Sequence, residues 1–315
     1  MTAKGQTQRA PGSTAALPRG FTSEPAARAY LESIQWPDGP ICPHCGVIDR
    51  ASPISGGRAG LYFCNACRKQ FSVTVGTIYE RSKVPLHTWL CVTHLLASSK
   101  KGISAHQIHR MVGVTYKTAW FMCHRIREAM KPAPSTPPLG GEGKRVEVDE
   151  TYIGNKPGVK SKRGGHSHKH TVLALVERGG KVRSFYMPQL HGVDMNDIVS
   201  RYADPKSHLR TDESNLYGDV GKKFASHETV NHSAEEYVRG DASTNTIEGV
   251  FSIFKRGMIG VYQHCGEQHL QRYLAEFDFR YSNRAKLGID DAQRADNALR
   301  GAKGKRLTYR RTDGA

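Results

Sequence analysis

The sequence lacks the marks of a membrane or secreted protein. Its apolar runs are only about five residues long, as at 172–176, whereas a membrane-spanning helix needs about 20 apolar residues. The first twenty residues have no apolar core, so no secretory signal is predicted and a cytoplasmic protein is expected. Acidic residues are also scarce, with 29 Asp and Glu against 46 Lys and Arg, which gives a net charge of +17. This excess favours a polyanionic partner, and nucleic acid is the leading candidate.

The chain of 315 residues is long enough for two or three domains. Residues 1–22 are predicted to be a disordered leader, because a segment rich in Thr, Ala, Gly and Pro buries too little apolar surface to offset its ordering entropy. Apolar residues at helical spacing over 24–36 predict a short amphipathic helix that ends before Pro37.

Four of the seven cysteines form two C-x-x-C pairs. Two such turns, eighteen residues apart, bring four thiolates onto one tetrahedral ion, so they predict a structural Zn²⁺ site. The alternative is a redox motif, which needs only one pair and a thioredoxin-like unit around it. We assign residues 23–82 to the amphipathic helix and this zinc ribbon. The predicted zinc ligands are Cys42, Cys45, Cys64 and Cys67.

Three helices are predicted in the segment 84–131. A short turn at Gly113 separates the last two, and Thr115 opens the third helix. This pattern is typical of a helix-turn-helix, whose last helix enters the DNA major groove. Tyr116 and Lys117 are then expected near the base edges. The alternative is a three-helix packing module that makes no contact with DNA.

A linker rich in Pro and Gly is predicted over 132–144, ahead of an α/β domain over 145–289. In the first strand of that domain, Val146 and Val148 alternate with acidic residues, which predicts one apolar face. The expected order is three antiparallel strands, a helix, two strands and a helix, the order of an RNase H-like mixed sheet. A short helix and a basic tail follow over 290–315. The expected strands lie at 145–153, 170–177, 181–187, 207–214 and 227–233, and the expected helices at 194–202 and from 245 onwards.

Three carboxylates are candidates for metal-dependent catalysis. Asp149 ends the first strand, Asp212 ends the fourth strand, and Glu248 lies in the first turn of the helix that opens at Asn245. Hard divalent cations need such oxygen ligands to converge from separate elements. Each residue also has a simpler explanation, since strand ends favour aspartate in turns and Asn245 with Glu248 fits a variant capping box. Competing ligands beside the two aspartates are Glu147, Glu150 and Glu213.

Two basic features accompany these carboxylates. Lys255 lies two helical turns after Glu248 on the same side, with Arg256 next to it. Histidines alternate at positions 166, 168 and 170 within a basic segment. A phosphate-facing loop is favoured there over a second metal site, because no carboxylate accompanies the histidines.

Five sequence blocks carry a resemblance to a known family and together span nearly the whole chain. They read YLESIQWPDGPICPHCG, VEVDETYIGNK, HLRTDES, YVRGDASTNTIEGVFSIFKRGMIGVYQHC and HLQRYLAEFDFRYSNR. In these blocks the chain is similar to the zinc-ribbon DDE transposases of small bacterial insertion sequences. The resemblance implies that Asp149, Asp212 and Glu248 are the catalytic carboxylates. Because some members have other residues at the third position, including Asn, it leaves Asn245 as an alternative to Glu248.

The resemblance also implies a reaction and its partners. Two Mg²⁺ ions, with Mn²⁺ as a substitute, would serve cleavage and strand transfer, while Lys255 and Arg256 hold phosphates. The expected partners are the double-stranded DNA of terminal inverted repeats and of a target. Pairing of two DNA ends implies a homodimer or a larger assembly at the nucleoid. Two other functions stay open: a DNA-binding regulator on an inactive catalytic fold, and a structure-selective RNase H-like nuclease.

Overall fold

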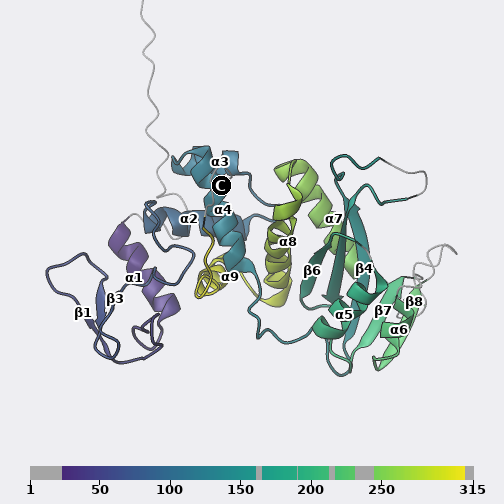
Figure 1. Cartoon of the computed structure of the whole chain (residues 1–315), viewed down its shortest axis with the longest axis horizontal. Helices are drawn as coiled ribbons and strands as arrows, with labels where there is room; N and C mark the ends of the chain where they lie inside the picture. The colour runs from purple at the N-terminus through teal and green to yellow at the C-terminus, as the bar shows by residue number, and fades with distance from the viewer. Residues whose placement is uncertain (1–22, 161–164, 190, 213–216, 231–244, 309–315) are drawn as a thin grey trace, which may run out of the picture. The chain divides into compact units, whose positions relative to one another are not determined.

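The computed structural model describes residues 23–160, 165–189, 191–212, 217–230 and 245–308 (Figure 1). The predicted leader over 1–22 and Glu213 lie outside these ranges. The chain forms two compact units. The first comprises Met1–Ser99, Ile103–Met130 and Asp291–Ala315, and the second Lys100–Gly102 and Lys131–Asp290. Within the described ranges, no helix is long and apolar enough to cross a membrane.

The first unit opens with a helix and a small antiparallel sheet. Helix α1 (Glu24–Gln35) precedes the strands β1 (Ala51–Pro53), β2 (Tyr62–Cys64) and β3 (Gln70–Phe71), which pair in that order. The apolar core beside the strands is small and largely aromatic. Trp36 meets Tyr62 and Phe71 edge to face at centroid distances of 5.5 and 5.8 Å, and Tyr62 stacks on Phe71 at 5.7 Å.

The three helices expected after the ribbon are present as α2 (Leu86–Ser98), α3 (Ala105–Val112) and α4 (Tyr116–Met130). The turn between α3 and α4 depends on Gly113, whose φ of 73° is a left-handed conformation that favours glycine. Thr115 then accepts a hydrogen bond from the backbone N–H of Thr118 at 3.2 Å. These local signals account for the helices and the short turn. They do not show that the helices bind DNA.

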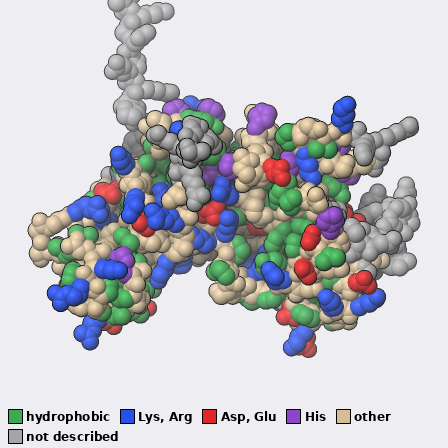
Figure 2. All heavy atoms as spheres, viewed as in Figure 1, with side chains coloured by type: hydrophobic (Ala, Val, Ile, Leu, Met, Phe, Trp, Pro, Cys, Tyr) green, Lys and Arg blue, Asp and Glu red, His purple; other side chains and the backbone are tan. Residues whose placement is uncertain are grey.

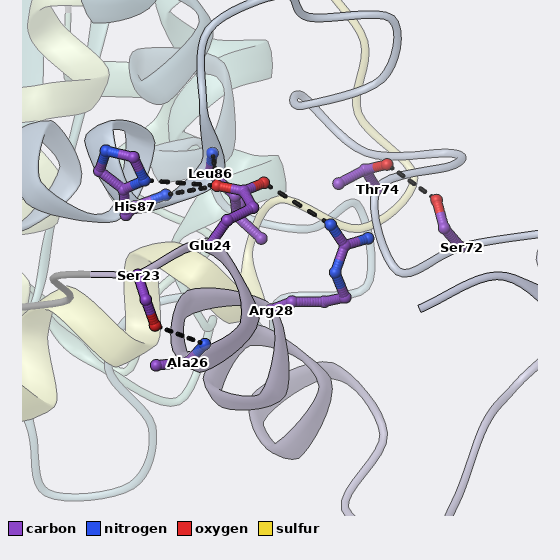
Figure 3. Close-up of polar contacts among 8 residues, drawn as sticks. All are labelled: Ser23, Glu24, Ala26, Arg28, Ser72, Thr74, Leu86 and His87. Atoms are coloured by element: carbon purple, nitrogen blue, oxygen red, sulfur yellow. Dashed lines mark hydrogen bonds and ion pairs between the residues drawn. The ribbon is translucent and has the colours of Figure 1, made fainter. Parts of the chain in front are cut away.

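The N-terminus of α2 is capped by a residue from another helix. Pro85 precedes α2 and provides no side-chain cap. Glu24 of α1 does so instead, because its carboxylate accepts the backbone N–H of Leu86 at 2.8 Å and pairs with Arg28 (Figure 3). Its negative charge also suits the positive end of the helix dipole. This hydrogen bond ties the ribbon's first helix to the helices that follow.

The predicted C-terminal segment is part of the first unit. Helix α9 (Asp291–Arg300) packs on α1, α2 and α4, which all precede the main segment of the second unit in the chain. The hydroxyl of Tyr30 donates to Asp296 within this packing. Part of the basic tail also contacts the protein, since Lys305 donates to the backbone oxygen of Ala129 at 3.1 Å.

The second unit is built on a mixed five-stranded sheet, as predicted. The strands follow the order β6-β5-β4-β7-β8, in which β4, β5 and β6 are antiparallel neighbours and β7 and β8 run parallel to β4. The first and fourth strands are therefore adjacent. The strands are β4 (Arg145–Ile153), β5 (His170–Glu177), β6 (Val182–Met187), β7 (His208–Asp212) and β8 (Ser226–Val230).

Helices cover both faces of this sheet. On one face, Val146 and Val148 pack with Met195 and Val199 of α5 and with the short helix α6. On the other face, Ala174 of β5 packs with the apolar stripe of α7. Strand β4 is thus buried on both sides, although its sequence alternates. The helices are α5 (Gly192–Tyr202), α6 (Gly218–Gly221), α7 (Asn245–Gly257), the π-helical turn η4 (Met258–Tyr262) and α8 (Glu267–Ser282).

Part of the segment predicted as a linker contributes to the core of the second unit. Leu139 is 3% exposed and packs with Val146. Its N–H donates to the backbone oxygen of Tyr202 at 2.8 Å, and it pairs with Ala203 in an isolated bridge. The chain therefore joins the sheet unit several residues before β4 begins.

Helix α8, which the sequence analysis did not identify, covers the edge of the sheet at β6. Three polar side chains of α8 form hydrogen bonds with backbone groups of β6 that a further strand would otherwise bind. Four backbone hydrogen bonds at distances of 2.6 to 3.1 Å link the helix to the strand. Backbone groups of an edge strand are thereby satisfied by side chains. The pairs are Ser282 with Val182, Asp278 with Ser184, and Gln271 with Ser184 and Tyr186.

Candidate metal centres

The four predicted zinc ligands converge in the first unit. The sulfurs of Cys42 and Cys67 lie 3.6 Å apart, and those of Cys45 and Cys64 lie 3.7 Å apart. All four sulfurs lie within 4.8 Å of one another. Tetrahedral zinc with bonds of about 2.3 Å places its sulfurs roughly 3.8 Å apart. The spacing therefore fits one Zn²⁺ held by four thiolates.

The two C-x-x-C turns share a backbone geometry. The residue after each second cysteine, Gly46 or Arg68, adopts a left-handed conformation with φ of 76° or 58°. Its N–H donates to the oxygen of the first cysteine in its pair at 2.9 or 2.8 Å. In the second turn, the backbone N–H of Cys67 donates to the sulfur of Cys64 and is the main cause that lowers the pKa of that thiol to about 7. This hydrogen bond thus favours the thiolate form of Cys64, which is the form that binds metal.

The second candidate centre lies where β7 ends beside the middle of β4. Asp212 ends its strand as predicted, whereas Asp149 does not, because β4 continues to Ile153. These strands pair in parallel with Glu147 opposite Arg210, and the same register two residues on sets Asp149 beside Asp212. Carboxylate oxygens of Asp149, Glu150 and Asp212 all lie within 4.8 Å of one another, and the three residues are half-buried. Such oxygens suit hard divalent cations.

Glu150 is more closely involved than the sequence indicated. Adjacent strand residues point to opposite faces, yet the Glu150 carboxylate reaches the same cluster as Asp149. The buried hydroxyl of Tyr217 donates to Glu150 Oε2 at 2.6 Å, which fixes the carboxylate and leaves its other oxygen for a further ligand. Tyr217 could not have been linked to the site from its position in the sequence.

The cluster concentrates negative charge. Burial raises the pKa of Asp149 to about 7, with further contributions from the charges of Glu150, Asp212 and Glu248. Burial also raises the pKa of Glu150, although its hydrogen bond from Tyr217 opposes this. A divalent cation would offset the repulsion among these carboxylates, so the donor set fits Mg²⁺ or Mn²⁺.

Glu248 lies near this cluster without joining it. It occupies the first turn of α7, and its charge acts on Asp149, although it is not among the three converging carboxylates. The position of Asn245 differs by one residue from that of a capping box, whose first residue precedes the helix. The helix already begins at Asn245, and the N–H of Ile247 is taken by Glu147 of β4 at 2.9 Å. The Glu147 carboxylate is therefore already hydrogen-bonded to α7, so Glu147 is no longer a competing metal ligand.

The predicted DNA contacts lie on helices of both units. Lys255 is half-buried on α7, whereas Arg256 is exposed and donates to the backbone oxygen of Ser252 at 3.0 Å. In the first unit Tyr116 is 44% exposed and stacks on His106 with ring centroids 4.1 Å apart, and Lys117 follows it. Figure 2 shows many Lys and Arg side chains and few acidic ones on the visible face of this unit.

The alternating histidines form no metal cluster among the described residues. The two groups found there that could hold a metal ion are the four cysteines and the three carboxylates. His166 instead lies with its ring 4.3 Å from that of Tyr152, and His170 is buried against Tyr186.

Comparison with known families agrees with both centres. Residues 138–282 match the model of the ISXO2-like transposase domain, and residues 22–70 match that of the transposase zinc-ribbon domain. The chain carries both domains of a zinc-ribbon DDE transposase. The first match includes Asp149, Asp212 and Glu248, together with α8, and the second includes all four zinc-site cysteines.

A relative supports the same conclusion over most of the chain. This transposase is 27% identical over 279 residues to an uncharacterized protein in the transposable element ISH50 of Halobacterium salinarum. The matched region covers 82% of this chain and 91% of the relative. The similarity therefore extends across both units rather than across one domain alone.

Proposed function

We propose that this transposase binds the terminal inverted repeats of its own element and catalyses Mg²⁺-dependent DNA cleavage and strand transfer. The observation that carries the proposal is the convergence of Asp149 and Asp212 from adjacent parallel strands within the transposase domain. Mn²⁺ is the expected substitute for Mg²⁺ because it accepts the same oxygen ligands.

The residues of the chain have distinct roles in this proposal. Asp149 and Asp212 hold the metal, Glu248 is the third catalytic carboxylate, and Glu150 is an additional ligand oriented by Tyr217. Asn245 remains an alternative to Glu248. When bound by these residues, two divalent cations would supply activation of the attacking oxygen and stabilisation of the leaving oxygen in an in-line phosphoryl displacement.

DNA is held by positive charge and by the helices of the first unit. Lys255 and Arg256 contact phosphates near the carboxylates, because both follow Glu248 on α7. Tyr116 and Lys117 contact bases from the N-terminal end of α4, with α3 and α4 acting as the helix-turn-helix. Cleavage at two ends requires a homodimer or a larger assembly on the DNA.

A joining assay tests the proposal. Purified protein, Mg²⁺, a labelled duplex that bears the element's end and a supercoiled target are incubated, with Asp149→Asn, Asp212→Asn, Glu150→Gln and Glu248→Gln compared with wild type. Glu177→Gln is the matched control, since Glu177 is a strand carboxylate of the same sheet that takes part in none of the proposed chemistry. We expect joined product from wild type and control, and none from either aspartate variant.

The other outcomes separate the alternatives. Cleavage without joining would indicate a nuclease, and binding without either reaction would indicate a regulator. Joining that survives Glu248→Gln and is lost in Asn245→Ala would move the third catalytic residue to Asn245. Comparable loss in Glu150→Gln and Glu248→Gln would place both glutamates at the metal site.

A further inference from the structure

The carboxylate of Glu147 is fully buried and takes no part in the chemistry proposed above. Its exposed fraction is 0%. It lies on β4 two residues before Asp149, so both side chains point to the same face of the sheet. Burial of an ionised carboxylate is costly unless a counter-charge and hydrogen bonds offset it. The partners of Glu147 therefore indicate why a charge is placed there.

Each oxygen of this carboxylate has a partner on a different element. Oε1 accepts a hydrogen bond from Nε of Arg178, in the β5–β6 turn, at 3.0 Å. Oε2 accepts the backbone N–H of Ile247 at 2.9 Å. Ile247 is the third residue of α7, within the first turn whose N–H groups have no acceptor inside the helix. Glu147 thus caps α7 from a strand, as Glu24 caps α2 from another helix.

This cap lies next to a proposed catalytic residue. Glu248 comes directly after Ile247, and its charge already acts on Asp149. One hydrogen bond therefore links the metal-binding strand to the first turn of α7, in addition to the apolar packing of α7 on the sheet. Asp149 lies two residues from its acceptor, and Glu248 lies one residue from its donor. We propose that Glu147 is a positioning residue that holds the first turn of α7, and with it Glu248, at the carboxylate cluster. The inference rests on the proposed function for the role of Glu248.

The same sheet offers a matched control. Glu177 of β5 also binds one backbone N–H and one cation, since its oxygens accept from Gly140 at 3.1 Å and from Lys144 at 2.9 Å. No candidate metal ligand adjoins either partner. Glu177→Gln therefore makes the same chemical change in the same sheet and leaves α7 untouched.

The experiment uses the full-length protein and two measurements that do not depend on catalysis. Hydrogen exchange of backbone amides, read by mass spectrometry, reports the first turn of α7, and calorimetric titration with Mn²⁺ reports the carboxylate site. An amide side chain can accept from only one of the two donors, so Glu147→Gln is expected to speed exchange in the first turn of α7 and to weaken Mn²⁺ binding, each about tenfold. Arg178→Lys should act in the same direction and less strongly. Glu177→Gln should change neither quantity.

Two results would overturn the positioning role. One is a Glu147→Gln protein whose α7 exchange and Mn²⁺ affinity match those of Glu177→Gln. The other is faster exchange spread evenly over the whole sheet, which would make Glu147 a general stabilising residue. If Glu147→Gln does not fold, Arg178→Lys decides alone, because an α7 effect supports the role and no effect rejects it. Failure of wild type to join DNA, with Mn²⁺ binding and the α7 effect intact, would reject the proposed reaction and keep the positioning role.

Discussion

The two candidate metal centres relate to their surroundings in opposite ways. The ribbon has strands of two or three residues and a core made largely of Trp36, Tyr62 and Phe71, which is little apolar surface for a stable fold. The carboxylate cluster lies on the central strand β4 and its neighbour β7 in a five-stranded sheet with helices on both faces. In the ribbon a bound metal would hold the fold together, whereas in the sheet the fold holds mutually repelling carboxylates that a metal would bind.

Loss of one zinc ligand should have the largest effect on structure. Cys64→Ser is expected to unfold the ribbon, because structural zinc supplies about 10 kcal/mol or more of binding free energy to such small modules. Zinc content and amide exchange over residues 42–71 measure the change. Cys91→Ser is the control, because Cys91 is a buried cysteine outside the predicted zinc site. The ribbon of this variant should keep its zinc. A ribbon that stays protected after zinc loss would contradict the comparison.

Loss of one carboxylate should do the reverse, removing activity and sparing the fold. Asp149→Asn is expected to lower joining at least about a thousandfold, or ~4 kcal/mol of barrier. The melting temperature of the metal-free protein should stay the same or rise, because the substitution removes one repelling charge. Thermal unfolding without metal checks this expectation. A melting temperature several degrees lower would mean that Asp149 also supports the fold.

The pH dependence of metal binding sharpens the same contrast. Because the pKa of Asp149 is raised to about 7 in the folded, metal-free protein, a proton competes with the cation below that pH. Mn²⁺ affinity should therefore fall as the pH decreases from 8 to 6, and the dependence should be weaker in Asp149→Asn. The sign for stability is opposite. A pKa raised above the unfolded value means that the metal-free fold loses stability as the pH rises from about 4 through 7. Titrations and denaturant melts at several pH values test both trends.

A substitution at the β6 edge of the sheet should lower the stability of the second unit moderately, and by the same amount with and without metal. Asp278→Asn weakens the acceptor for the backbone N–H and hydroxyl of Ser184, each at 2.6 Å. We expect a loss of about 1–2 kcal/mol in the free energy of unfolding of the second unit, equal with and without Mn²⁺. Ser252→Ala on the exposed side of α7 is the control. Denaturant unfolding in both conditions gives the comparison.

The smallest expected effect is a gain in stability from a substitution in the second C-x-x-C turn. Arg68 has a φ of 58°, whereas Gly46 fills the equivalent position of the first turn. Arg68→Gly should relieve the left-handed strain and stabilise the zinc-loaded ribbon by about 0.5 kcal/mol, after the greater flexibility of the unfolded chain is subtracted. Arg58→Gly, at a position without this strain, should not stabilise it. Thermal melts of the two variants side by side resolve the difference.

The sequence was informative where the signals are local. The bounds of β4 and β5 agree with the prediction, since runs of β-branched residues ended by turn residues define a strand within a few positions. The convergence of the four cysteines follows from the fixed geometry of their two turns. Asp149 and Asp212 could be placed together because they lie on strands that the fold sets side by side, although β4 continues past Asp149.

What the sequence could not indicate depends on contacts between distant residues. The hydrogen bond from Ile247 to Glu147 spans one hundred positions, and that from Tyr217 to Glu150 spans sixty-seven. Leu139 lies in a segment whose prolines and glycines predict only a linker, yet its burial depends on Tyr202. Such pairings are set by the packing of whole elements, and no local pattern distinguishes these residues from neighbours of the same type.

The helix along β6 limits how copies of this transposase can associate. A sheet grows between molecules only where a strand has free backbone groups, and α8 already occupies those of β6. Among the described strands, β8 at the other end pairs on one side only, with β7. Any dimer that extended the five-stranded sheet beyond its end strands would therefore join through β8, because α8 blocks strand addition at β6.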